Sequence, residues 1–198
     1  MKSRGLHRLI GITMLVPFFA WAITGLIFSI KPGYSSAYET LQTKTYPLDG
    51  EVLIKTDPEW LEFRYMKTVL GMHLLAKTSE GWLHLDAATR SPKPSPGDEE
   101  TRSLVQDAMS ANPQRYGKIV NVAGNKITTD TGTQITLDWN RLSLAQRGPD
   151  TDRIDLLYRI HYLQWTGLPS LDRVIGITGI VLILILSALG LRLFFVSR

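Results

Sequence analysis

The sequence predicts a membrane protein in which two transmembrane α-helices flank an extracytoplasmic α+β domain. Two uncharged apolar stretches carry this prediction, residues 9–30 near the N-terminus and residues 174–191 near the C-terminus. A helix of about 20 residues crosses a hydrocarbon core of about 30 Å, and both stretches are about that long. The buried core helix of a soluble protein would normally keep a polar stripe, which the second stretch lacks.

The first apolar stretch also has an alternative interpretation as a cleaved signal peptide. Lys2, Arg4 and Arg8 precede it, as basic residues precede the apolar region of a signal peptide. Its apolar region is longer than a signal peptide needs, although Ser36-Ala37 leaves a cleavage site open. We therefore predict a retained transmembrane helix, with Pro17 as the position of a kink that a membrane helix can accommodate.

The charges beside the two stretches predict the orientation of the chain. Basic residues gather at the outer ends of both stretches, which the positive-inside rule places in the cytoplasm. They are Lys2, Arg4, Arg8, Arg192 and Arg198. Lys31 and Arg173 lie on the opposite side and weaken this signal without reversing it. Both termini are thus predicted to be cytoplasmic and the central region to be extracytoplasmic.

The predicted organisation has six consecutive segments. A cytoplasmic N-terminus and a first transmembrane helix are followed by a periplasmic α+β domain and an interfacial amphipathic helix with a turn. A second transmembrane helix and a cytoplasmic C-terminus complete the chain. The predicted bounds are, in that order, residues 1–8, 9–30, 31–149, 150–170, 171–195 and 196–198.

Composition excludes several classes of chemistry. The chain has 198 residues, a formal net charge of +4 and no cysteine, so it has no disulfides, thiolate metal sites, iron–sulfur clusters or cysteine nucleophiles. The terminal basic residues suit the surface of an anionic lipid bilayer, and no basic stripe with interleaved aromatic residues indicates nucleic-acid binding. We predict three features of the partners: a lipid bilayer, either a second copy of the chain in a homodimer or a partner membrane subunit, and no nucleic acid.

The central region reads as short elements separated by turns. We expect a short helix over residues 36–43, a β-hairpin within residues 58–86, and a helix that Ser95 or Asp98 caps and that ends before residue 112. A second hairpin turns at Asp130-Thr131-Gly132. An amphipathic helix over residues 150–165 then leads to the second apolar stretch.

No constellation of residues in this region indicates catalysis. The triplet Asp130-Thr131-Gly132 matches that of aspartic proteases, but its flanking strands predict a hairpin turn and no second aspartate occurs in a similar context. Neither a phosphate-binding loop nor a Gly-x-Ser-x-Gly elbow is present. His73 and His84 fall in the first predicted hairpin, where two ligands make a poor zinc site, so we predict an exposed pair. The sequence favours a function other than catalysis, with no catalytic or metal-binding residue.

Three segments resemble a known family. The opening LHRLIGITMLVPFFAWAITGLIFS is similar to the first helix of PepSY-associated transmembrane proteins. The segment VLGMHLLAKTSEGWLHLDAATRSPKP resembles a PepSY domain, although Arg90 stands where that domain's Asp-x-x-Thr-Gly turn has glycine. LYRIHYLQWTGLPSLDRVIGITGIVLILILSALGLRLFF is similar to the later histidine-bearing helix of the family. The resemblance implies a short, two-helix member in a bacterial inner membrane, with a PepSY-like domain in the periplasm.

The resemblance also implies candidate haem ligands. Larger members of the family include haem-bearing reductases of ferric siderophores, and His7 and His161 match their histidine positions. These two residues are therefore candidate ligands of haem b, the one cofactor that the resemblance suggests. They are predicted on opposite sides of the membrane, about 30 Å apart, so one haem would need a homodimer or a partner subunit. Otherwise His161 is an interfacial side chain and His7 a headgroup contact beside Arg8.

Three functions follow from this resemblance. The first is an accessory or interaction subunit, connected with iron or haem processes. The second is a haem-binding subunit that moves electrons across the membrane, and the third is a module that restrains a periplasmic protease. Small residues in the apolar stretches predict close helix packing. They are Ala20, Ala22, Gly25, Gly176, Gly179 and Gly190.

Overall fold

The computed structural model describes residues 3–50 and 53–196. Lys2 and Arg198, two of the charges used to predict the orientation, lie outside the described residues. The chain divides into two compact units, one formed by its two ends, residues 1–34 and 150–198, and one by residues 35–149. The first is called here the helical unit and the second the α+β unit, and each is described by itself.

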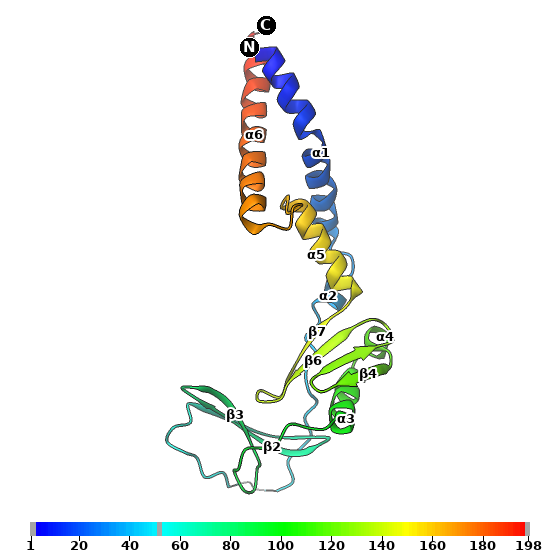
Figure 1. The fold of residues 1–198 in the computed structure, drawn as a ribbon, viewed down its shortest axis with the longest axis vertical. Coiled ribbons are helices and arrows are strands. Elements are labelled where there is room, and N and C mark those ends of the chain that lie inside the picture. The colour runs from blue at the N-terminus through cyan, green and yellow to red at the C-terminus, as the bar shows by residue number, and fades with distance from the viewer. Residues whose placement is uncertain (1–2, 51–52, 197–198) are drawn as a thin grey trace. The chain divides into compact units, whose positions relative to one another are not determined.

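The helical unit contains two long apolar helices, α1 (Ser3–Ile30) and α6 (Pro169–Val196). They lie side by side and antiparallel in Figure 1. Both are long and apolar enough to cross a membrane, and their own chain buries only 17% and 6% of their most apolar windows. A core helix of a soluble protein would be largely buried, so the exposed apolar surface favours a bilayer. Two apolar helices flanking an α+β region were predicted, and this part of the fold class is confirmed.

Small residues lie where the two long helices meet. A Cβ atom added to Gly179 would lie 2.9 Å from Leu163 Cδ1 and 3.3 Å from Trp21 Cη2. One added to Gly190 would lie 3.3 Å from His7 Cε1. These two glycines therefore allow the close approach that the sequence predicted for the helices, here within a single chain. Gly25 has no atom within 4 Å of such a Cβ and takes no part in it.

The third helix of this unit, α5 (Pro149–His161), ends four residues earlier than residue 165, where the sequence placed its end. Leu163 follows with a positive φ of 55°, which stops the helix and turns the chain. The carboxylate of Asp172 then holds the start of α6, because its Oδ1 accepts hydrogen bonds from Thr166 N–H at 2.9 Å and from Thr166 Oγ1 at 2.7 Å. The turn between α5 and α6 is thus fixed by side-chain contacts.

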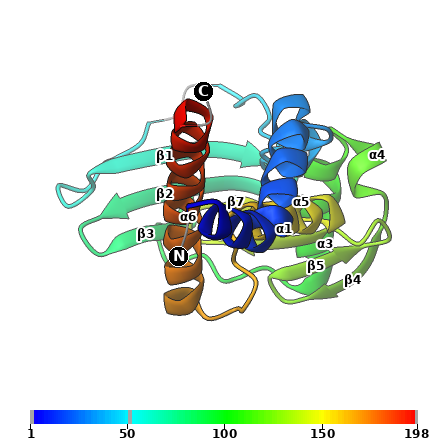
Figure 2. The ribbon, with the colours of Figure 1, turned by 90° about the horizontal axis from the view of Figure 1, so that it is seen from above.

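The α+β unit contains two antiparallel sheets. The first has the order β1-β2-β3, formed by β1 (Glu62–Thr68), β2 (Gly71–Thr78) and β3 (Gly81–Leu85), which lie side by side in Figure 2. The second sheet has the order β4-β5-β6-β7 and comprises β4 (Ile119–Ala123), β5 (Lys126–Thr129), β6 (Gln134–Asp138) and β7 (Ser143–Arg147).

Short helices complete this unit. α3 (Asp98–Met109) lies in the chain between the two sheets, and α4 (Pro113–Tyr116) follows it. The N-cap of α3 is Gly97, whose N–H donates to Glu100 Oε2 at 3.0 Å, so the prediction of Ser95 or Asp98 as the cap was wrong. Asp98 begins the helix instead, where its charge favours the N-terminus. The helix predicted over residues 36–43 is only α2 (Tyr34–Ala37), because the following residues form no regular element.

The strand predictions agree with the structure in different degrees. The hairpin at Asp130-Thr131-Gly132 is confirmed by the pairing of β5 with β6. The hairpin predicted within residues 58–86 is a three-stranded meander, because β1 also pairs with β2 along its whole length. The central strand β2 is buried on both faces, which the alternating pattern of a two-stranded hairpin does not indicate.

One main core joins the two sheets to α3. It contains side chains from β2, from α3 and from the second sheet, so both sheets contribute to the same core. Its buried residues include Leu75, Leu104, Val105, Met109, Tyr116, Ile127 and Ile135. A smaller cluster of Leu74, Ala76 and Leu85 covers the other face of the first sheet. The histidines of β2 and β3 lie between these elements.

Candidate functional site

Two histidines of the α+β unit form a buried pair. His73 on β2 and His84 on β3 are 0% and 3% exposed, and His73 Nδ1 lies 2.9 Å from His84 Nε2. The prediction of an exposed pair was wrong. Burial of an imidazole costs free energy unless its nitrogens are hydrogen-bonded. Each of these four nitrogens has a partner.

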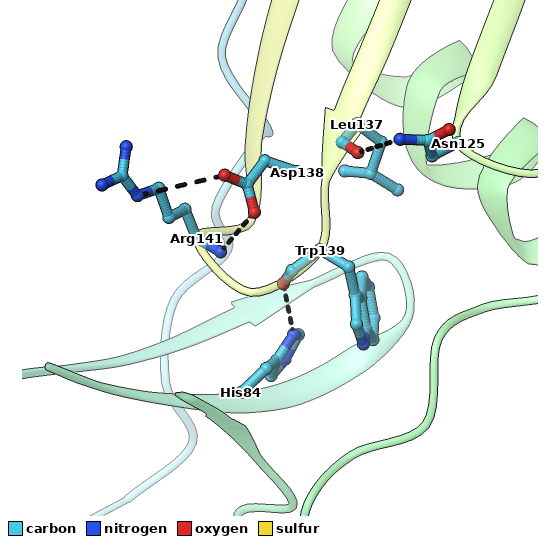
Figure 3. A network of polar contacts seen from close by, with 6 residues as sticks. All are labelled: His84, Asn125, Leu137, Asp138, Trp139 and Arg141. Atoms are coloured by element: carbon cyan, nitrogen blue, oxygen red, sulfur yellow. Dashed lines mark hydrogen bonds and ion pairs between the residues drawn. The ribbon is translucent and has the colours of Figure 1, made fainter. Parts of the chain in front are cut away.

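The hydrogen-bond partners fix the tautomers of the pair when both rings are neutral. The carbonyl of Trp139 can only accept, so His84 Nδ1–H donates to it across 2.7 Å (Figure 3). His84 Nε2 then accepts from His73 Nδ1–H, and His73 Nε2 accepts from the hydroxyl of Thr68 at 2.7 Å. Thr68 Oγ1 in turn accepts from Leu70 N–H at 3.1 Å. The chain of hydrogen bonds runs in one direction and leaves no ring nitrogen free.

The surroundings of the pair favour its neutral form. Burial, together with the nearby positive charge of Lys93 and the neighbouring His84, lowers the pKa of His73 from 6.5 to about 3. Burial also lowers the pKa of His84, although the hydrogen bond to Trp139 opposes the shift. Lys93 itself donates from Nζ to the carbonyl of Met72 at 2.6 Å. At neutral pH the pair is therefore uncharged and its tautomers are those derived above.

This network connects the two sheets of the α+β unit. Trp139 belongs to the turn between β6 and β7, and its ring lies 4.1 Å from the ring of His84, centroid to centroid. Its indole N–H donates to the carbonyl of Lys93 at 3.2 Å. Because every polar atom is used, the pair offers neither a metal ligand nor a general base. Its chemical role is to hold the second sheet against the first.

The second candidate region lies in the helical unit, at the end of α5. Thr24 Oγ1 on α1 lies 2.8 Å from His161 Nδ1, and the same hydroxyl lies 2.5 Å from the carbonyl of Ala20. The hydroxyl hydrogen is directed to that carbonyl, so Thr24 Oγ1 accepts from His161 Nδ1–H. His161 Nε2 then carries the lone pair. This is the tautomer of a histidine that ligates through Nε2.

Aromatic side chains surround His161. The indole N–H of Trp21 donates to the backbone carbonyl of His161. The ring of Phe28 meets the imidazole edge-to-face at 5.1 Å and stacks on Tyr158 at 4.7 Å, both between centroids. The ring of His161 is thus held by α1 in a fixed orientation, which the amphipathic pattern of residues 150–165 did not indicate.

His7 lies on α1, far from Thr24, the residue of that helix that contacts His161. Thr24 follows it by 17 residues on α1, which corresponds to about 26 Å at about 1.5 Å per residue. Its Nδ1 atom is buried without a hydrogen-bond partner, and its ring lies against Gly190 of α6. The structure therefore holds His7 and His161 at separate places, and they cannot ligate one iron within a single chain.

Comparison with known families decides the affiliation of the chain. The family described as PepSY-associated TM region matches residues 2–197, essentially the whole chain. The chain belongs to this family. No curated protein and no solved structure matches it. Family membership and the two apolar helices together support a membrane protein with a PepSY-associated region, as the resemblance predicted.

The turn over residues 86–90 is closed by hydrogen bonds to one aspartate. Asp86 Oδ1 accepts from the N–H groups of Ala88 and Thr89, at 3.0 and 2.8 Å, and from Thr89 Oγ1 at 3.0 Å. These hydrogen bonds lower the pKa of Asp86. Arg90 has a φ of 61°, a left-handed conformation that favours glycine. The aspartate therefore closes the turn without the glycine.

The remaining polar groups of this PepSY-associated protein offer few ligands. Within residues 3–50 and 53–196, no group of three or more His, Asp or Glu side chains is placed to hold a metal ion. A cavity of about 570 Å³ lies beside Trp139 and is lined by polar side chains that include Asn125, Thr136 and Asp138. Figure 3 shows Asn125 donating to the carbonyl of Leu137 at this place. This lining contains neither a histidine nor a cysteine.

Proposed function

We propose that this chain is an accessory subunit of the bacterial inner membrane. In this proposal both termini are cytoplasmic, the α+β unit is periplasmic, and α1 and α6 bind lipid and a partner subunit. The apolar surface that α1 and α6 leave exposed is the observation that carries the proposal. It supplies far more apolar surface than the two helices use against each other, and helix association in membranes uses such faces.

The interior of the α+β unit supports the same proposal. Its two histidines are hydrogen-bonded on all four nitrogens, so they hold the fold together and leave no group for chemistry. A domain whose buried histidines serve its packing suits a subunit that binds or positions another protein. The proposal therefore assigns recognition to the α+β unit and anchoring to the helices.

Reporter fusions and mass measurement test the proposal. We expect a periplasm-active phosphatase fused after Thr101 to be active, and one fused before Met1 to be inactive, because the rule for basic residues places the termini inside. Full-length protein purified in mild detergent from its native membrane should have a mass that includes a partner subunit. An active reporter before Met1 would refute the orientation, and a purified monomer would refute the accessory role.

A second candidate function is a haem-binding subunit, which the tautomer of His161 favours. Its Nε2 carries a lone pair while Nδ1–H is fixed by Thr24, which is the arrangement of an axial histidine. A haem with two histidine ligands does not fit one chain, since His7 lies about 26 Å away along α1. The same iron would need His161 of a second copy. Haem would supply one-electron transfer when bound.

An absorption spectrum separates the two candidates. Protein purified from haem-supplied cells should show a Soret band if His161 ligates haem, and the variant His161→Gln should lose it. The variant His7→Gln is the matched control and should keep the band. A colourless wild-type protein that co-purifies with a partner would support the accessory role and exclude the haem.

A further inference from the structure

A cavity of about 580 Å³ lies in the helical unit where α5 turns into α6. Its lining combines two arginines, Arg159 and Arg173, with a tyrosine, Tyr162, and with two apolar side chains of α6, Ile177 and Ile180. Charged residues therefore line one part of the cavity and apolar residues another. This is the pattern of a site for an amphipathic anion.

The positive charge of the cavity is largely uncompensated. One carboxylate, Asp172, also lines it, but its Oδ1 already accepts two hydrogen bonds from Thr166, and Arg159 interacts with it electrostatically. Across the described parts of the chain, the guanidinium of Arg173 makes neither a hydrogen bond nor an ion pair. Two guanidinium groups against one carboxylate leave a net positive site. Guanidinium groups bind phosphate oxygens through paired N–H donors.

The depth of each group along α6 matches the layers of a bilayer. Arg173 lies four residues beyond Pro169, the start of α6, which is about 6 Å along the axis, and Ile177 lies about 12 Å along it. The headgroup region at each face of a bilayer is about 5–8 Å thick, and the acyl chains begin below it. Exposed aromatic rings of Tyr162 and Trp165 lie at the same end, as at a membrane interface.

We propose that this cavity binds one anionic glycerophospholipid. Arg159 and Arg173 bind the phosphate, and Ile177 and Ile180 contact the first part of an acyl chain. The proposal gives Arg173 a role at the end of α6 where a basic residue opposes the positive-inside pattern. It rests on α6 crossing the membrane and is independent of the accessory role proposed above.

Native mass spectrometry of the full-length chain in mild detergent tests this proposal. We expect one dioleoyl phosphatidylglycerol to remain bound at a lipid concentration at least tenfold lower than dioleoyl phosphatidylcholine requires. The double variant Arg159→Gln/Arg173→Gln should lose this preference. The variant Arg192→Gln, which removes a charge at the other end of the same helix, should keep it.

The contrary outcomes are equally specific. Equal retention of both lipids by the wild type, or an unchanged preference in the double variant, would overturn the proposal. Inorganic phosphate that displaces the glycerophospholipid at equal concentration would show a phosphate site and would likewise overturn the lipid assignment. The single variant Arg173→Gln, at an exposed and unpaired side chain, should show a partial loss and keeps the test valid if the double variant fails to fold.

Discussion

The two units of this protein use histidine in opposite ways. In the α+β unit, His73 and His84 are buried and all four of their ring nitrogens form hydrogen bonds. In the helical unit, His161 donates from Nδ1 to Thr24 and keeps the lone pair of Nε2. The difference teaches that an imidazole becomes structural where the fold closes a complete chain of partners around it. Where the fold supplies one partner only, the other nitrogen stays available for a ligand.

Removal of one histidine from the hydrogen-bonded pair of the α+β unit should have the largest effect on stability. We expect His84→Ala to destabilise the α+β unit by about 2–4 kcal/mol, because it leaves a cavity and deprives His73 Nδ1–H and the Trp139 carbonyl of partners. Denaturant unfolding of the full chain, followed by tryptophan fluorescence, measures this. Leu83→Ala, at the neighbouring and exposed position of β3, is the control and should change stability by less than about 1 kcal/mol. Equal effects would contradict the role given to the pair.

The hydrogen-bonded pair of His73 and His84 should also make the free energy of unfolding depend on pH. The fold lowers the histidine pKa values, so below the unfolded value of 6.5 the unfolded chain binds more protons. Stability is therefore complete above about pH 6.5 and falls as the pH approaches 3, by at most about 1.4 kcal/mol per pH unit for His73, and His84 adds a loss in the same direction. Asp86, whose ordinary pKa is 3.8, contributes only near and below that pH.

Denaturant titrations at pH 7, 6 and 5 measure this slope. The double variant His73→Leu/His84→Leu, which replaces both partners together, should show a much flatter dependence over the same range. The variant His161→Gln should keep the wild-type slope, since its histidine lies in the other unit. A wild-type stability that is constant from pH 7 to pH 5 would show that the pair titrates freely.

An intermediate effect on helix packing is expected at Gly179, where α6 packs near the region of His161. Gly179→Leu should cost about 1–3 kcal/mol through overlap with Leu163 and Trp21. The chain has no cysteine, so disulfide formation between Gly11→Cys and Leu186→Cys reports the distance between α1 and α6. We expect cross-linking in membranes to fall several-fold. Gly25→Leu, which meets no neighbouring atom, should leave it unchanged, and equal losses would argue against the contact at Gly179.

The smallest effect concerns the turn over residues 86–90, which follows His84 in the chain. Arg90→Gly should stabilise the protein by about 0.5–1 kcal/mol, because glycine adopts the left-handed conformation without a Cβ penalty. Ala88→Gly in the same turn is the control and should destabilise it by about 0.5 kcal/mol through the entropy of the unfolded chain. Thermal unfolding measures both. A loss of stability in both variants would show that the φ of Arg90 carries no strain.

The difference between the prediction and the structure is clearest at the histidines. Alternation along residues 58–86 indicated strands. Nothing local showed that the carbonyl of Trp139, more than fifty residues later, accepts a hydrogen bond from His84. The exposed pair was predicted because two histidines alone make a poor zinc site, and that reasoning does not consider a buried, hydrogen-bonded pair. A signal was present in retrospect, because both histidines stand beside leucines in strands that are largely apolar.

The sequence by itself determined the two apolar helices, the α+β class of the region between them, the second hairpin and the family. The helices, the class and the hairpin follow from length, charge and periodicity, which are local and additive along the chain, and the family follows from the resemblance of three segments. The tertiary structure alone decided which histidine nitrogens are occupied, where α5 stops and which residues line the cavity at the start of α6. Each of these depends on side chains brought together from distant parts of the sequence, and a hydrogen bond forms only when both partners are in place.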